Sequence, residues 1–191
     1  MRYRSQPLLH PFLLLELTAL VLWASNAQAG LVTYSDYPAW NSAVSGVTSV
    51  TIPDPAPDPF VYFGTGSAST SYGGVVFSTD GGISDSSFYN VGTMFSGVSA
   101  VLSSQSATTG PENILILFPA PVYGFALNYG TFEGSNVSFL LSNGAAFAQS
   151  STGGNSYDAP DFVGVTDDGD SFSSVLITSN DPGLNIRSLS Y

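Results

Sequence analysis

Cysteine is absent from this 191-residue sequence, and basic residues and histidine are nearly absent. Without cysteine the chain can form no disulfide, no thiolate zinc site and no cysteine nucleophile. Its three basic residues, all arginine, stand against 14 aspartates and glutamates, and the formal net charge is −11. Because binding to nucleic acid or to anionic lipid depends on basic side chains, the composition excludes both classes of partner.

The N-terminal segment has the three parts of a secretory signal. Two arginines precede an apolar stretch from Phe12 to Trp23, and Ala27-Gln28-Ala29 matches the small-residue pattern at which signal peptidase cleaves. The apolar stretch is shorter than the roughly 20 residues that a transmembrane helix needs. We therefore predict a cleaved signal peptide over 1–29 and a secreted domain over 30–191. The mature domain has no transmembrane segment and is extracellular or retained in the periplasm.

The predicted mature domain has very few groups that can support catalysis. It contains a single cationic side chain, Arg187, and no histidine. Ser-His-Asp, Cys-His and Ser-Lys arrangements and histidine zinc sites are therefore impossible. Paired carboxylates, as in glycoside hydrolysis, are the chemistry that remains. The two glutamates of the domain, Glu112 and Glu133, are the candidates, and both flank turn residues.

Short apolar segments, bounded by Gly, Pro, Asn, Asp or Ser, recur about every ten residues along the domain. This pattern is typical of strands joined by turns. It predicts an all-β fold, a single antiparallel β-sandwich of jelly-roll type with one short N-terminal helix. The expected strands cover residues 31–34, 47–52, 61–63, 75–78, 98–102, 113–118, 122–129, 136–142, 162–166, 172–178 and 185–191.

Alternation at period two predicts which faces of the strands are buried. One face is expected to carry Val137, Phe139 and Leu141, and another Tyr123, Phe125, Leu127 and Tyr129. The run Ile114–Phe118 is apolar at every position, which favours a central strand covered on both sides. The segment Pro53–Pro59 is too rich in proline for a central strand and is expected to be a stiff connection.

The predicted helix lies shortly after the start of the mature domain. Ser35 or Asp36 can cap it, and Pro38 suits its first turn. Trp40 and Val44 are four residues apart and would share one face of the helix.

Several of these segments together resemble the secreted bacterial β-sandwich proteins of the PEP-CTERM-associated group. The resemblance implies an exported sandwich domain from exopolysaccharide or biofilm surroundings. It does not extend to the group's sorting tail, because no Pro-Glu-Pro motif with an apolar span and a basic end occurs before Tyr191. Free release or retention by another route is then expected. The segments that carry the resemblance are Val32–Trp40, Gly74–Ser78, Pro121–Leu127, Phe162–Thr166, Phe172–Thr178 and Ile186–Tyr191.

A cluster of carboxylates marks one predicted turn. Asp167, Asp168 and Asp170 lie within four residues, with a glycine between them. Converging carboxylate oxygens are ligands for a hard cation such as calcium, so these residues form a candidate metal site. Asp and Gly are also ordinary turn residues, and a solvated acidic hairpin is the alternative.

Aromatic side chains are the candidates for contact with sugars, because an exposed ring offers a flat apolar platform. Tyr72, Tyr89 and Tyr157 lie in Gly-, Ser- and Asn-rich surroundings, and Trp40 is the only tryptophan of the mature domain. Packing in the core is the alternative role for each of them.

These observations favour a non-catalytic extracellular domain that binds glycan or matrix, or that is a structural component of the matrix. The expected partner is an extracellular polysaccharide, and calcium is the one candidate cofactor. The alternative is a carbohydrate-active hydrolase or lyase that uses paired carboxylates. The sequence does not determine the oligomeric state.

Overall fold

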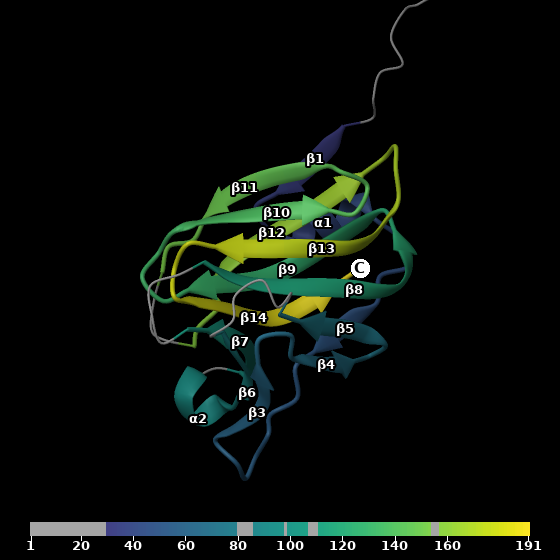
Figure 1. Ribbon diagram of the computed structural model, residues 1–191. Coiled ribbons are helices and arrows are strands. Elements are labelled where there is room, and N and C mark those ends of the chain that lie inside the picture. The colour runs from purple at the N-terminus through teal and green to yellow at the C-terminus, as the bar shows by residue number, and fades with distance from the viewer. Residues whose placement is uncertain (1–29, 80–85, 98, 107–110, 154–156) are drawn as a thin grey trace, which may run out of the picture.

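Alternating apolar and polar residues between frequent turn residues fold the chain into two antiparallel β-sheets that pack face to face (Figure 1). The computed structural model describes residues 30–79, 86–97, 99–106, 111–153 and 157–191. The predicted all-β sandwich is confirmed, whereas the predicted signal peptide over 1–29 lies outside the described residues. None of the described helices has the length and apolar character needed to cross a membrane.

The larger sheet has eight strands, all of them paired antiparallel. β2 (Ser49–Thr51) pairs with the last residues of β14 and lies outside the main strand order of the sheet. That order is β1 (Leu31–Tyr34), β12 (Asp161–Asp167), β9 (Gly124–Thr131), β14 (Gly183–Ser190), β7 (Val101–Gln105), β6 (Ser87–Val91) and β3 (Phe60–Thr65).

The smaller sheet has six strands and lies in front of the larger one in the view of Figure 1. Along the chain from β8 to β14, most connections pass from one sheet to the other, as in a jelly roll. Its strand order is β11 (Ala146–Ser150), β10 (Asn136–Leu141), β13 (Phe172–Ser179), β8 (Glu112–Val122), β5 (Val75–Ser78) and β4 (Ser69–Tyr72).

All of the expected strands are present, most of them with shifted ends. β1 and β5 have the predicted limits, and the proline-rich segment 53–59 is a connection as predicted. β7 begins at Val101, later than predicted, and residue 98 lies outside the described part. Three strands were not predicted, β4, β6 and β11. β4 and β11 consist largely of small or polar residues, and β6 has adjacent aromatic residues, so none of the three shows a clear apolar–polar alternation.

The core lies between the two sheets, and the side chains that alternate inward fill it. Val137, Phe139 and Leu141 are buried there as predicted. The expectation that Ile114–Phe118 is covered on both faces is wrong. Ile114, Ile116 and Phe118 face the core, but Leu117 on the opposite face is 45% exposed, because no described element covers that side of β8.

Tyr123 also departs from its predicted position. It is 63% exposed, whereas Phe125, Leu127 and Tyr129 of the same predicted face are buried. The reason is a break in the strand. β8 ends at Val122 in one sheet and β9 begins at Gly124 in the other, so Tyr123 lies at the corner between them.

The predicted helix is α1 (Tyr37–Ala43), and Asp36 caps it by accepting a hydrogen bond from the Ala39 N–H at 2.8 Å. The side chain of Trp40 is fully buried, and its indole N–H donates to the Val165 carbonyl at 3.0 Å. Gly164 allows this close contact, because a Cβ there would lie 2.7 Å from the Cβ of Trp40. A second short helix, α2 (Thr93–Ser96), was not predicted.

We expect Gly164→Ala to lower the free energy of unfolding by about 1–3 kcal/mol, because the new methyl group overpacks the site occupied by Trp40. Urea unfolding measures the change. Ser138→Ala, on the exposed face of β10, is the control and should change stability by less than about 0.5 kcal/mol. Equal stability of Gly164→Ala and the wild type would contradict the packing described for Trp40.

The buried phenol of Tyr129 makes stability depend on alkaline pH. Burial, together with the negative charge of Asp161, raises the pKa of Tyr129 to about 12 from 10.0. The folded state therefore holds this proton more tightly than the unfolded state does. The resulting contribution to stability is complete below pH 10 and is lost as the pH rises from 10 towards 12.

We expect Tyr129→Phe to flatten this alkaline fall in the free energy of unfolding. It also removes the hydrogen bond from the Tyr129 hydroxyl to the Ser150 carbonyl, which costs about 0.5–1.5 kcal/mol at neutral pH. Urea unfolding at a series of pH values measures both effects. The exposed Tyr123→Phe is the control and should keep the wild-type slope.

Candidate functional site

The outer face of the larger sheet carries a second, smaller hydrophobic cluster. Along β6, Phe88 faces the core between the sheets, so Tyr89 and Val91 face outward. The register of β3 against β6 pairs Phe60 with Val91 and Tyr62 with Tyr89, which brings two more aromatic residues to the same area. Apolar side chains thus gather on a sheet face that would ordinarily be polar.

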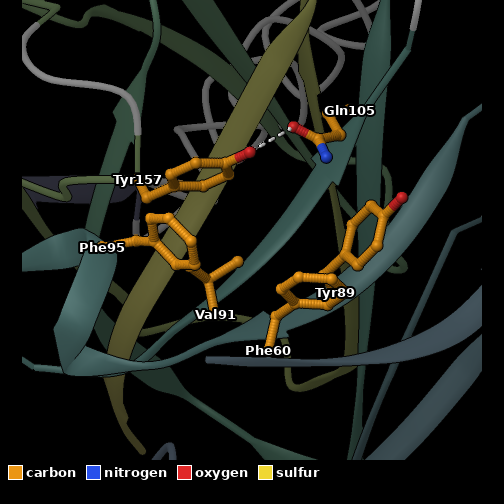
Figure 2. Close-up of a pocket in the computed structure, with 6 residues that line it drawn as sticks. All are labelled: Phe60, Tyr89, Val91, Phe95, Gln105 and Tyr157. Carbon is orange, nitrogen blue, oxygen red and sulfur yellow. Dashed lines mark hydrogen bonds between the residues drawn. The ribbon is translucent and has the colours of Figure 1, made fainter. Parts of the chain in front are cut away.

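A pocket of about 240 Å³ opens in this area. Figure 2 shows the rings of Tyr157 and Phe95 on one side and those of Phe60 and Tyr89 on the other, with Val91 between them. Gln105 completes the lining with a side-chain amide. The six described lining residues include no charged side chain. The pocket is therefore an aromatic cavity with a few uncharged hydrogen-bonding groups.

The aromatic rings continue beyond the pocket in contact with one another. The ring centroids of Phe60 and Tyr89 are 5.8 Å apart, and those of Tyr62 and Tyr89 are 5.1 Å apart. On the other side, Phe95 lies 6.2 Å from Tyr157. Phe60, Tyr62 and Phe95 are about half exposed. A contiguous exposed apolar patch on a folded domain is a candidate binding surface.

Tyr157 has an unusual backbone conformation for a residue with a side chain. Its φ is 70°, the only positive value at a non-glycine residue in the described part of the chain. Such a conformation costs about 1–3 kcal/mol and persists only where the surrounding structure holds it. The phenol hydroxyl of Tyr157 donates to the Oε1 atom of Gln105 at 3.1 Å, so the ring is fixed across the pocket.

The segment that follows Tyr157 is fastened to the sheet by several contacts. The Asn185 side-chain amide donates to the Asp158 carbonyl at 3.2 Å, and the Arg187 guanidinium lies 3.5 Å from the Asp158 carboxylate. Ala159 is fully buried against the outward-facing cluster. Gly130 leaves room for the segment, because a Cβ there would lie 2.5 Å from the Asp158 carbonyl oxygen. These contacts hold Tyr157 in its strained position.

Two of the four aromatic residues predicted as ligand platforms come together in this pocket. Tyr89 contributes from β6 and Tyr157 from the segment before β12. The prediction of Trp40 as a ligand platform is wrong. Its ring is fully buried and its N–H is already bonded to the backbone, so it offers no surface to a ligand. Tyr72 on β4 is partly buried against the core, and its hydroxyl accepts a hydrogen bond from Asn90 at 3.3 Å, outside the pocket.

Sequence reasoning missed the other members of the site. Phe60 and Tyr62 carry a usable signal, since two aromatic residues at period two directly follow the proline-rich connection. Phe95 and Gln105 carry none, because their place in the pocket depends on the unpredicted helix α2 and on the register of β7.

The acidic turn does not bring three carboxylates together as metal ligands. Within the described ranges, no group of three or more His, Cys, Asp or Glu side chains could hold a metal ion. Asp167 is buried and accepts hydrogen bonds from the Asn143 amide at 2.9 Å and from the Gly169 N–H at 3.2 Å, while Asp168 and Asp170 are exposed. Calcium binding at this turn stays a prediction without a preformed ligand set.

The two glutamates proposed for catalysis differ in their surroundings. Glu112 is completely buried and accepts a hydrogen bond from the Ser104 hydroxyl, whereas Glu133 is exposed on a turn. A carboxylate with no exposure does not reach the glycosidic bond of a polymer. In this structure the pair is not arranged for glycoside hydrolysis.

No family model matches the chain, and no curated protein matches it, so the resemblance to the PEP-CTERM-associated group stays a prediction. Solved structures of carbohydrate-binding modules are distantly similar. A mutant of the family 29 module CBM29-2 is 13% identical with a TM-score of 0.33, over 77% of this chain and 91% of that one. The module CBM6cm-2 of Cellvibrio mixtus lichenase 5A, solved with cellotriose, is 13% identical with a TM-score of 0.28, over 75% and 94%. Values this low carry no conclusion about the ligand of this chain.

We expect Arg187→Gln to loosen the segment that holds Tyr157. The pair with Asp158 is partly exposed, so its loss should cost less than about 1 kcal/mol of global stability. Hydrogen exchange at the backbone amides of Asp158 and Ala159 should nevertheless accelerate severalfold. Asp168→Asn, which changes an exposed carboxylate outside this segment, is the control. Unchanged exchange in Arg187→Gln would show that the pair does not hold the segment.

Proposed function

We propose that this protein is a secreted, non-catalytic domain that binds an extracellular glycan in the aromatic pocket on the outer face of its larger sheet. The observation that carries the proposal is the set of half-exposed aromatic rings around a cavity whose wall holds a fixed amide and phenol. Secretion rests on the signal peptide predicted from the sequence.

The chemistry of a sugar ring suits this arrangement. A pyranose has faces made of C–H groups and an edge made of hydroxyl groups. Aromatic rings gain free energy by covering the apolar faces, while amide and phenol groups bond to the hydroxyls. Phe60 and Phe95 supply purely apolar surface on opposite sides of the pocket, and Gln105 and Tyr157 supply the polar atoms.

The strained loop holds one wall of the pocket in place. Tyr157 adopts a costly φ where its ring packs edge-on against Phe132, with centroids 5.4 Å apart, and also lines the cavity. A binding site gains from such a conformation, because the ring is already placed when the ligand arrives.

We expect Phe60→Ala and Phe95→Ala each to weaken polysaccharide binding by about tenfold or more, which corresponds to the loss of about 1.4 kcal/mol or more at an exposed aromatic contact. Both side chains are half exposed, so the fold should survive. Retention of the purified protein on a panel of insoluble polysaccharides identifies a binding polymer, and calorimetry with its soluble fragments gives the affinity.

Tyr123→Ala is the matched control, because this aromatic residue is well exposed but does not line the aromatic pocket. It should bind as the wild type does. Failure of the wild type to bind any polymer, or wild-type affinity in both phenylalanine variants, would reject the pocket as a glycan site.

A further inference from the structure

The charges around the aromatic pocket restrict the class of glycan that it can hold. Arg187 is the only cationic side chain of residues 30–191. It is three-quarters buried and lies 3.5 Å from the Asp158 carboxylate. A uronate or sulfate group in the pocket would find no free positive partner and would meet the repulsion of a strongly acidic protein. Acidic polysaccharides are therefore disfavoured.

A cationic glycan also lacks a partner at this site. Among the described residues that line the pocket, none is a carboxylate. Asp158, which directly follows Tyr157 in the chain, already accepts from the Ala159 N–H at 2.7 Å and pairs with Arg187. An amino sugar entering the pocket would lose water from its ammonium group without gaining an ion pair. The lining therefore suits an uncharged sugar.

The size of the pocket indicates how much of the ligand it encloses. A volume of about 240 Å³ is below the roughly 300–1,000 Å³ of pockets that enclose drug-sized ligands. It suits a single sugar ring. The rest of a chain must then lie on the surface outside.

The aromatic surface continues in one direction from the pocket. Tyr62 lies beyond Tyr89, with ring centroids 5.1 Å apart, and it is half exposed. On β3 it follows Phe60 on the same face, about 7 Å further along the strand. Its hydroxyl is bonded to the Thr65 hydroxyl, which fixes the ring. In the described part of the chain β3 is the outermost strand of the larger sheet, so no described strand pairs with it on the side away from β6.

We infer that the ligand is an uncharged polysaccharide chain, with one sugar ring in the pocket and the next ring stacked on Tyr62. The inference rests on the proposed function and adds the class of glycan and the direction of the chain. It implies an affinity that depends on chain length and is independent of salt and of calcium.

The first experiment compares charge classes by calorimetry on the purified protein. The probes are hexasaccharides of β-1,4-glucan, β-1,4-mannan and β-1,4-xylan, together with those of polygalacturonate and chitosan. Each is measured at about 0.02 M and about 0.5 M sodium chloride, and again with a chelator. Between these two salt concentrations the distance over which exposed charges interact falls severalfold. We expect at least one neutral probe to bind with the same affinity within twofold in every buffer, and no charged probe to bind.

The outcomes separate this inference from the proposed function. A charged hexasaccharide that binds best, weakens with salt and is lost in Phe60→Ala would overturn the inference while leaving the pocket as a glycan site. Loss of neutral binding with the chelator would also overturn it. Binding of no probe at all would overturn both.

The second experiment tests the direction of the chain. We expect Tyr62→Ala to weaken binding of the preferred hexasaccharide by about tenfold and to leave binding of its monosaccharide, followed by NMR titration, unchanged. Tyr62→Phe keeps the ring and should bind the hexasaccharide like the wild type within about twofold. Wild-type affinity for the hexasaccharide in Tyr62→Ala, or an equal loss for both ligands, would show that the chain does not run over this residue.

Discussion

The packing of two apolar sheet faces against each other is the interaction on which the whole molecule depends. With no disulfide to link the layers, the inward-facing side chains of both sheets must supply the cohesion. The outward-facing positions that alternate with these residues do not have to be apolar for the core to form. The outward positions of β6 and β3 use this freedom, because Tyr89, Phe60 and Tyr62 carry large rings on the face that the core does not need.

Much of this architecture could be predicted from the sequence, because strand alternation and turn residues are local signals. Val137, Phe139 and Leu141 are buried as their spacing predicts, and Asp36 caps the one helix that the sequence indicated. The run Ile114–Phe118 was misread because an all-apolar strand does not reveal whether a second layer covers it. β4, β6 and β11 were missed because none of them shows a clear apolar–polar alternation.

The site itself was predictable only in part. Tyr89 and Tyr157 were candidates because they lie among small polar residues, but nothing local distinguishes them from Tyr72, and Trp40 was a candidate only as the single tryptophan of the domain. What separates the two pairs is long-range, namely the register between strands and the way the segment at Asp158 lies across the sheet. Residue type indicated aromatic side chains as candidates, and the fold determined which of them line the pocket.

The left-handed backbone at Tyr157 affects how much the shape of the pocket would change when a ligand binds. A ring held in place before any encounter has already lost its conformational freedom during folding, so little further entropy is lost on association. The wall of the pocket should then have the same shape with or without a partner, as in complexes whose backbone moves little on binding. If the proposed function holds, the protein surface would stay rigid on binding, and the flexible glycan chain would make the adjustment.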